Sequence, residues 1–322
     1  MTSRELVKSI INFEGMDRYA YDFPDPYGSD IYWEVRDHNN PDNRLANGVD
    51  EWGCVWETRT GTTYGEVTKP LINDWSEFDK IKIPDITDPN RWKKLEGMRE
   101  AAGDKYLLVQ GMSLYERIYF VRGIEDTWMD LYSDPEQIQR FIDILVDMNL
   151  EAIKRFATVD PDGYIIGDDW GLQKQLMISP DMWRQFWKPA YAKVFDACHK
   201  AGIQTFLHSC GYIVDILDDL IEIGLDVYHT DQQQNMGLEV LGEKFGGRLT
   251  FFATVDIQNM MVHGSNSDVR RYCRQMDKYL GREKGGLIPR WYVDPKSVGH
   301  TWENISAMCD EFIKISKERF GK

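Results

Sequence analysis

The segment Ile203-Gln204-Thr205-Phe206-Leu207-His208-Ser209-Cys210-Gly211 is an apolar, strand-like run that ends in a His-x-Cys pair and a glycine. Successive side chains of a strand point to opposite faces, so His208 and Cys210 leave the strand end on the same side. An imidazole and a thiolate together suit zinc, although a zinc site needs at least three protein ligands. A buried cysteine can equally be a small apolar residue of the core.

Working outward from this segment, the chain from about residue 104 alternates short apolar runs with amphipathic helical segments. Six such runs predict strands: Tyr106–Met112, Gly163–Asp169, Ile203–Ser209, Leu225–Thr230, Leu249–Val255 and Gly286–Trp291. Six strand–helix units in a row predict a parallel sheet with helices outside it. With one or two strands from the N-terminal region, the units form a closed (β/α)8 TIM barrel of the α/β class. A doubly wound open sheet is the alternative, and the lack of a Gly-x-Gly-x-x-Gly or Walker-type loop disfavours its nucleotide-binding form.

Several helix starts are marked in the sequence. Ser133-Asp134-Pro135-Glu136 has the pattern of a capping box with proline in the first turn, and an apolar stripe from Ile138 to Phe156 follows it. Ser179, before Pro180, and Thr301 are predicted to cap two later helices.

Residues 1–103 differ from the rest. They begin with a helix and a strand-like Arg18–Phe23, and a long irregular stretch follows from about Pro24 to Trp92. It is too apolar to be disordered, and such an excursion beside a sheet is often a lid or a pocket wall. We therefore expect a single domain over residues 1–322, in which 1–103 form an extension and lid over the barrel mouth and 104–322 form the main run of βα units.

Charge and composition narrow the function classes. The 322 residues include 38 Lys and Arg against 53 Asp and Glu, a net charge of −15. An acidic surface argues against nucleic acid or an anionic membrane as a partner. There is no apolar run of ~18 residues and no signal-peptide pattern. Five cysteines without a C-x-x-C motif are typical of free thiols in a reducing compartment, which predicts the cytoplasm.

The predicted strands end in unusually polar residues. In a barrel, catalytic groups lie at the C-terminal strand ends. Simple structural roles remain open for single members: Asp168 as a cap, Asp256 as a turn residue, and Glu116 with Arg117 as an ion pair. Our candidate catalytic residues are Asp169, Glu116 and Asp231; our candidate substrate-binding residues are Trp170, Tyr115, Trp291, Arg290 and Gln232; our candidate metal ligands are His208 and Cys210.

Motifs along nearly the whole chain resemble the uroporphyrinogen decarboxylase-like superfamily, and more closely its branch of corrinoid-dependent methyltransferases. They are Asp17-Arg18, Asp25-Pro26-Tyr27-Gly28-Ser29-Asp30, Asp50-Glu51-Trp52-Gly53-Cys54, Gly167-Asp168-Asp169-Trp170-Gly171, Ile178-Ser179-Pro180, His208-Ser209-Cys210-Gly211, Val255-Asp256-Ile257-Gln258 and Glu303-Asn304-Ile305. The resemblance implies a single (β/α)8 barrel with an N-terminal extension over its mouth. The arginine-rich N-terminal motif of the decarboxylases is not visible here.

The resemblance also implies a zinc ion, which methyltransferases of this branch often bind through His-x-Cys and a distant cysteine. His208 and Cys210 match the first two ligands. Where the distant cysteine is expected, the chain reads Gly285-Gly286-Leu287-Ile288-Pro289-Arg290-Trp291, and Cys273 lies in a predicted helix. A carboxylate is the expected replacement, with Asp169, Glu116 and Asp231 as the candidates.

The leading hypothesis is a methyltransferase of the O-demethylase type. It would move a methyl group from a small, methoxylated aromatic compound to a corrinoid protein, with zinc or a carboxylic acid activating the leaving group. The alternatives are a metal-free decarboxylase or lyase, and a non-catalytic corrinoid- or ligand-binding accessory protein. Small-molecule donor and corrinoid protein are the expected partners, and a homodimer is left open.

Overall fold

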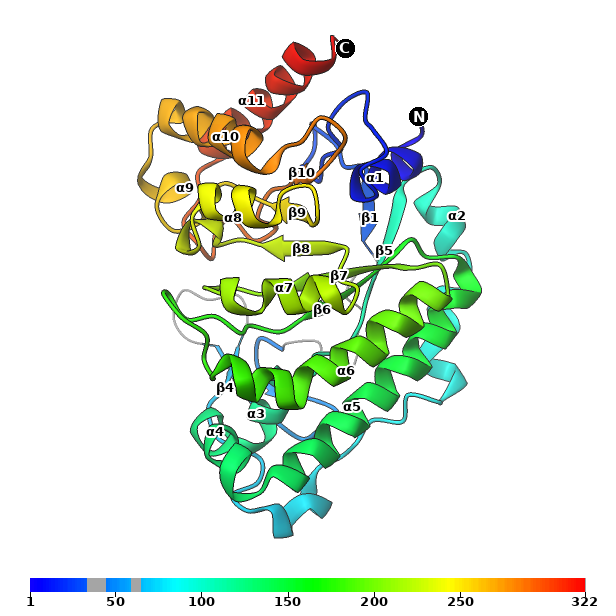
Figure 1. Cartoon of the computed structure of the whole chain (residues 1–322). Coiled ribbons are helices and arrows are strands. Elements are labelled where there is room, and N and C mark those ends of the chain that lie inside the picture. Colours follow the sequence, from blue (N-terminus) through cyan, green and yellow to red (C-terminus); the bar gives the residue numbers. More distant parts are fainter. Residues whose placement is uncertain (34–44, 59–64, 322) are drawn as a thin grey trace.

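A parallel sheet of seven strands forms the centre of the computed structural model, which describes residues 1–33, 45–58 and 65–321 (Figure 1). The strands lie in the order β1, β5, β6, β7, β8, β9, β10. Their bounds are β1 Ile31–Trp33, β5 Tyr106–Gln110, β6 Gly163–Gly167, β7 Gln204–His208, β8 Val227–Thr230, β9 Thr250–Ala253 and β10 Leu287–Pro289. Each pair is parallel and in regular register, as the strand–helix alternation predicts.

The segment around Asp22 joins the two ends of this sheet. The Asp22 N–H donates to the Pro289 carbonyl at 3.0 Å, and the Trp291 N–H donates to the Asp22 carbonyl at 3.0 Å. On its other side, the Asp30 N–H donates to the Tyr21 carbonyl at 2.8 Å. This short segment therefore takes the place of an eighth strand, and the sheet closes into the predicted α/β barrel. The open-sheet alternative is wrong.

The helices that follow the strands lie outside the barrel (Figure 1). The chain's α-helices are α1 Ser3–Ile11, α2 Met98–Ala102, α3 Glu116–Arg122, α4 Ile124–Ser133, α5 Pro135–Phe156, α6 Pro180–Lys200, α7 Val214–Glu222, α8 Leu238–Phe245, α9 Met260–His263, α10 Asn266–Leu280 and α11 Trp302–Phe320. Ser179 and Thr301 cap α6 and α11 as predicted. The predicted Ser133 cap is wrong, because Ser133 is the last residue of α4 and the next helix begins at Pro135 without a side-chain cap.

The barrel interior holds a small apolar core to which each strand contributes. Its strand members are Ile31, Tyr106, Leu108, Ile165, Phe206, Val227, Phe252 and Ile288, and α1 adds Leu6, Val7, Ile10 and Ile11. Because α1 packs against the N-terminal ends of β5 and its neighbours, it closes the bottom of the barrel. A second, larger core fills the space between the sheet and the outer helices. The opposite, C-terminal end of the barrel is the mouth.

A small antiparallel sheet occupies part of the long N-terminal stretch. Its strands are β2 Gly48–Val49, β3 Val55–Glu57 and β4 Glu66–Val67, and the 3-10 helices Trp75–Lys80 and Pro89–Leu95 follow it. A buried ion pair between Arg117 and Asp50, with 2.6 Å between Nη1 and Oδ2, fixes this sheet to α3. The predicted irregular stretch also includes residues 34–44 and 59–64, which lie outside the described residues.

The six predicted strands are confirmed, and each is two or three residues shorter than its apolar run. The predicted strand at Arg18–Phe23 is reduced to the single bridging position at Asp22. Within the described residues, no helix combines the length and hydropathy that crossing a bilayer requires.

Candidate metal centre

The alternation of side chains along the strands places a set of polar residues at the barrel mouth. Because side chains alternate between the two faces of a strand, a residue two or four positions after one that faces the barrel axis also faces this axis. The residues placed in this way are Asp169 after β6, His208 and Cys210 at the end of β7, His229 and Asp231 at the end of β8, and Arg290 after β10. Most of the candidates from the sequence therefore converge at the mouth, where barrels carry their active sites.

Three of these side chains present donor atoms to one common point. The His208 Nε2 lies 3.5 Å from the Cys210 Sγ and 3.5 Å from the Asp169 Oδ1. Zinc–nitrogen and zinc–oxygen bonds of about 2.1 Å and a zinc–sulfur bond of about 2.3 Å give tetrahedral edges of roughly 3.4 to 3.6 Å. The two distances from His208 Nε2 thus match the spacing of zinc ligands, and all three donor atoms lie within 4.8 Å of one another. Imidazole, thiolate and carboxylate are donors that zinc accepts.

Backbone contacts fix the loop that carries Cys210. The Cys210 N–H donates to Asp169 Oδ1 at 2.8 Å, and the Gly211 N–H donates to Gln232 Oε1 at 2.8 Å. Gly211 has φ +76°, and a Cβ there would meet the Gly171 carbonyl oxygen at 2.1 Å, so the position requires glycine. Gln232, predicted to bind substrate, here supports the loop that carries Cys210.

The Cys210 thiol lies in a buried position close to two carboxylates. Burial, followed by the charges of Asp169 and Asp231, raises its pKa well above the usual range. A bound metal reverses this effect, because a coordinating thiol is deprotonated outright. The Cys210 thiol would therefore ionise readily only with a positive charge beside it.

His229 lies beside this cluster, and our prediction of ligands from the sequence missed it. It pairs in register with His208 on the neighbouring strand, and the two ring centroids are 4.4 Å apart. Both of its ring nitrogens are buried without a hydrogen-bond partner, since its Nε2 is 3.6 Å from Asp231 Oδ1. Burial, Arg290 and His208 lower its pKa to about 3, so the imidazole is neutral. The equivalent strand-end position of the two histidines was the signal available in the sequence.

Asp231 and Arg290 bind each other. Arg290 Nη1 is 2.6 Å from Asp231 Oδ1, and both side chains are almost fully buried. Although burial opposes ionisation, the Arg290 charge lowers the pKa of Asp231 far below its usual range. Arg290 Nε has no hydrogen-bond partner and lies 4.0 Å from Asp22 Oδ2. The predicted catalytic carboxylate and the predicted substrate-binding guanidinium therefore form one ion pair at the mouth.

Glu116 is the first residue of α3 and is positioned by Asp168. The Asp168 carboxylate accepts hydrogen bonds of 2.8 to 3.0 Å from the backbone N–H groups of residues 114–116, and one of 2.6 Å from the Tyr191 hydroxyl. Burial and the charge of Glu116 raise the pKa of Asp168 to about 8, against the effect of these donors. The Glu116 charge also acts on the Cys210 thiol. Asp168 is thus a positioning residue for the loop that brings Glu116 towards the centre.

Comparison with known proteins agrees with this barrel and its polar mouth. The family model of uroporphyrinogen decarboxylase (URO-D) matches residues 49–288, most of the chain. The chain belongs to the URO-D family. Among solved structures, it is similar to a methyltransferase from Methanosarcina mazei, with a TM-score of 0.71 and 15% identity over 98% of this chain and 99% of that one. This likeness establishes the same fold along the entire URO-D barrel.

A second solved structure similar to this URO-D family chain is a B12-independent methionine synthase from Shewanella sp. W3-18-1. Its TM-score is 0.48, with 11% identity over 71% of this chain and 68% of that one. No curated protein sequence matches the chain significantly.

Two of the predicted ring-binding residues lie outside the URO-D barrel's mouth. Tyr115 and Trp170 are fully buried and stack on each other, with ring centroids 4.0 Å apart. Trp170 follows the outward-facing series of β6 and packs on Trp183 and Trp187 of α6. Both rings are therefore enclosed by other aromatic side chains instead of lining the mouth. Trp291, which follows Arg290, is partly exposed.

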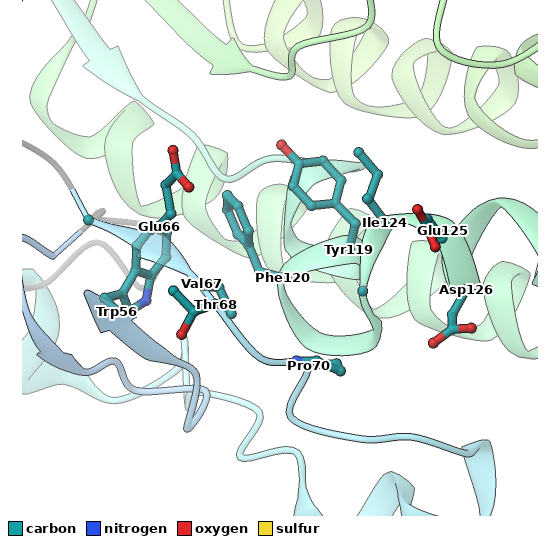
Figure 2. Close-up of a pocket in the computed structure, with 12 residues that line it drawn as sticks. Trp56, Glu66, Val67, Thr68, Pro70, Tyr119, Phe120, Ile124, Glu125 and Asp126 are labelled. Carbon is teal, nitrogen blue, oxygen red and sulfur yellow. The ribbon is translucent and has the colours of Figure 1, made fainter. Parts of the chain in front are cut away.

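A pocket lies between the small β2–β4 sheet and helices α3 and α4 (Figure 2). Trp56 and Phe120 stand side by side in it, and Glu125 and Asp126 lie at its other end. Neither Asp169, His208 nor Cys210 lines this pocket, so it is separate from the candidate metal centre. Tyr119 connects the two regions, because it lines the pocket while its hydroxyl donates to Glu116 at 2.7 Å.

Proposed function

We propose that the chain is a methyltransferase that takes a methyl group from a small methoxylated aromatic compound and passes it to the cobalt of a separate corrinoid protein. The observation that carries the proposal is the cluster of Asp169, His208 and Cys210, in which His208 Nε2 lies 3.5 Å from a donor atom of each of the other two residues.

Asp169, His208 and Cys210 would hold the zinc ion. When bound, zinc supplies Lewis acidity to the ether oxygen, which makes the departing aryloxide a better leaving group. The three residues also fix where the oxygen must lie, because the loop bonds of Cys210 and Gly211 leave the donors little freedom.

The reaction is a displacement at the methyl carbon. The reduced corrinoid donates the electron pair that forms the cobalt–carbon bond, the carbon–oxygen bond breaks, and its electron pair stays on the oxygen. The oxygen then takes up one proton. We propose Glu116 in its protonated form as the proton donor, because its carboxyl is buried and is held by the Tyr119 hydroxyl.

Asp231 and Arg290 would neutralise each other's charge at the barrel mouth. Asp231 is committed to Arg290 at 2.6 Å, so we propose a supporting electrostatic role for the pair. Trp291 follows axis-facing Arg290 and packs against the core between the sheet and the outer helices, so we do not assign it to the donor's ring. Tyr115 and Trp170 would stiffen the wall behind Glu116.

We propose that residues 1–322 act as one domain, with residues 1–103 as an extension and lid beside the mouth. The attachment of the β2–β4 sheet to α3 through Arg117 and Asp50 supports this, because α3 begins with Glu116. The mouth must remain accessible to the corrinoid protein, so the interface with that partner is transient and of modest area.

The test is whether the zinc-loaded protein transfers a methyl group from a methoxylated arene to free cob(I)alamin. The reaction is monitored by the loss of the cob(I)alamin absorbance. We expect turnover in the parent and in His263→Ala, a control at the end of α9, and at least about a hundredfold loss in Cys210→Ser, as for removal of a group acting on the leaving oxygen. No transfer from any methoxylated arene, with metal-independent release of carbon dioxide from a carboxylated substrate, would overturn the proposal in favour of a decarboxylase.

A further inference from the structure

The cysteines outside the mouth do not supply a second thiolate. Cys198, Cys273 and Cys309 are buried in α6, α10 and α11, in the core between sheet and helices. Cys54 is buried beside the Phe120 carbonyl, 3.5 Å from its sulfur. Any protein ligand beyond Asp169, His208 and Cys210 must therefore be an oxygen or nitrogen donor.

We propose that His229 is a further zinc ligand and stands in for the second thiolate. This inference rests on the proposed zinc centre. His229 pairs in register with His208, so both imidazoles leave adjacent strands towards the barrel axis. Their ring centroids are 4.4 Å apart, and the donor atoms of His208, His229 and Asp231 lie within 4.8 Å of one another. These donors and the Asp169–His208–Cys210 donors form two groups that share His208, so the His229 side chain must move towards Asp169 and Cys210 for all four to ligate one ion.

The second observation is that the His229 side chain has no other partner. Three histidines of the described residues have a buried ring nitrogen without a hydrogen bond, and His229 is the one in which both nitrogens lack a partner. By contrast, His300 Nε2 lies 3.0 Å from the Ile257 carbonyl. A buried polar group without a partner costs about 1–3 kcal/mol, so an imidazole is retained at such a position only with a compensating contact. A metal ion at the mouth supplies that contact.

Asp231 is the other donor of this second group, and its pairing favours His229 as the ligand. Its Oδ1 is 2.6 Å from Arg290 Nη1, so ligation by this oxygen would compete with a buried guanidinium. The lone pairs of His229 face no such competition. The order of preference among the β8 residues is therefore His229 before Asp231.

This ligand set bears on the substrate. Two imidazoles, one carboxylate and one thiolate form a harder set than a set with two thiolates, and harder donors favour oxygen ligands at the metal. The set is consequently suited to an O-methyl donor such as an ether more than to a thiol or thioether. This identifies methylated oxygen compounds as the substrate class of the centre.

The experiment measures zinc affinity and the visible spectrum of the cobalt(II)-substituted protein. Zinc dissociation constants come from competition with a chelating dye, for the parent, His229→Ala and the control His263→Ala. We expect the dissociation constant to rise at least about tenfold in His229→Ala, since even second-shell losses cost about 10- to 100-fold, and not to change in His263→Ala. The cobalt d–d bands should shift in His229→Ala alone.

A rescue variant keeps the test decisive if His229→Ala folds poorly. His229→Cys should restore the zinc affinity and strengthen the sulfur-to-cobalt charge-transfer band, which a merely structural role would not do. Zinc bound by the parent, with the same affinity and cobalt spectrum in both His229 variants, would overturn this inference alone. Failure of the parent to bind zinc would overturn the proposed metal centre and this inference together.

Discussion

Replacing Asp168 should be among the most destabilising single changes in the barrel. Its carboxylate accepts three backbone N–H groups from residues 114–116 and the Tyr191 hydroxyl, and the side chain is fully buried. Asp168→Ala leaves three buried N–H groups without an acceptor, at about 1–3 kcal/mol each, so we expect a loss of at least about 3 kcal/mol. Asp168→Asn keeps Oδ1 for two of the N–H groups and orphans that of Leu114, so it should cost about 1–3 kcal/mol.

The assay is the shift of the urea unfolding midpoint, converted to a free energy of unfolding under conditions where refolding is complete. Asp160→Asn is the matched control, because the Asp160 side chain is 71% exposed and its pair with Arg4 should contribute no more than about 1 kcal/mol. A cost below about 1 kcal/mol for Asp168→Ala, or equal costs for Asn and Ala, would refute the reasoning that Asp168 organises this loop.

Three further predictions follow from contacts elsewhere. The hydrogen bond that His199 donates to Asp226 raises the pKa of His199. The pair therefore stabilises the protein fully below the ordinary histidine pKa of about 6.5, and this effect is lost as the pH rises through the raised pKa. His199→Ala should thus cost more free energy of unfolding at pH 5.5 than at pH 8.5 in urea melts, and an equal cost would contradict the assignment. Arg290→Met leaves the buried Asp231 carboxylate unpaired and should cost about 3–5 kcal/mol, with partial recovery on adding Asp231→Asn; no recovery would speak against the pair. Gly211→Ala should weaken zinc binding at least about tenfold, because its Cβ would collide with the facing backbone and displace Cys210; unchanged affinity would show that the loop tolerates the collision.

The strand pattern was readable from the sequence because each barrel strand is a short apolar run followed by a helix. Phe206, Val227 and Ile288 face the axis, and the period of two then carries the polar residues that follow them into the mouth. The resemblance to the URO-D family, which the family match confirms, supplied the barrel's closure. Strands of two or three residues, such as β2 and β4, show no such period and depend on tertiary contacts.

The sequence predicted which residue types gather at the candidate site, but it predicted less well which side chains contact each other there. The sequence placed His208, Cys210 and Asp169 at adjacent strand ends, and the structure brings their donor atoms together. It did not show that Arg290 is bound to Asp231, because that pairing joins two strands far apart in sequence. We assigned Trp170 to the mouth, although it comes one residue after Asp169 and therefore faces the outer helices instead of the barrel axis. The period of two could have separated these residues.

The proposed function depends on whether Asp169, His208 and Cys210 hold a zinc ion. We would first measure the zinc content of the purified protein by elemental analysis, with His208→Ala, Cys210→Ala and the control His263→Ala beside it. We expect about one zinc per chain in the parent and the control, and loss of zinc from the other two variants while their circular dichroism is unchanged. No zinc in the parent under metal-replete conditions, or full occupancy in His208→Ala and Cys210→Ala, would contradict the proposed zinc site.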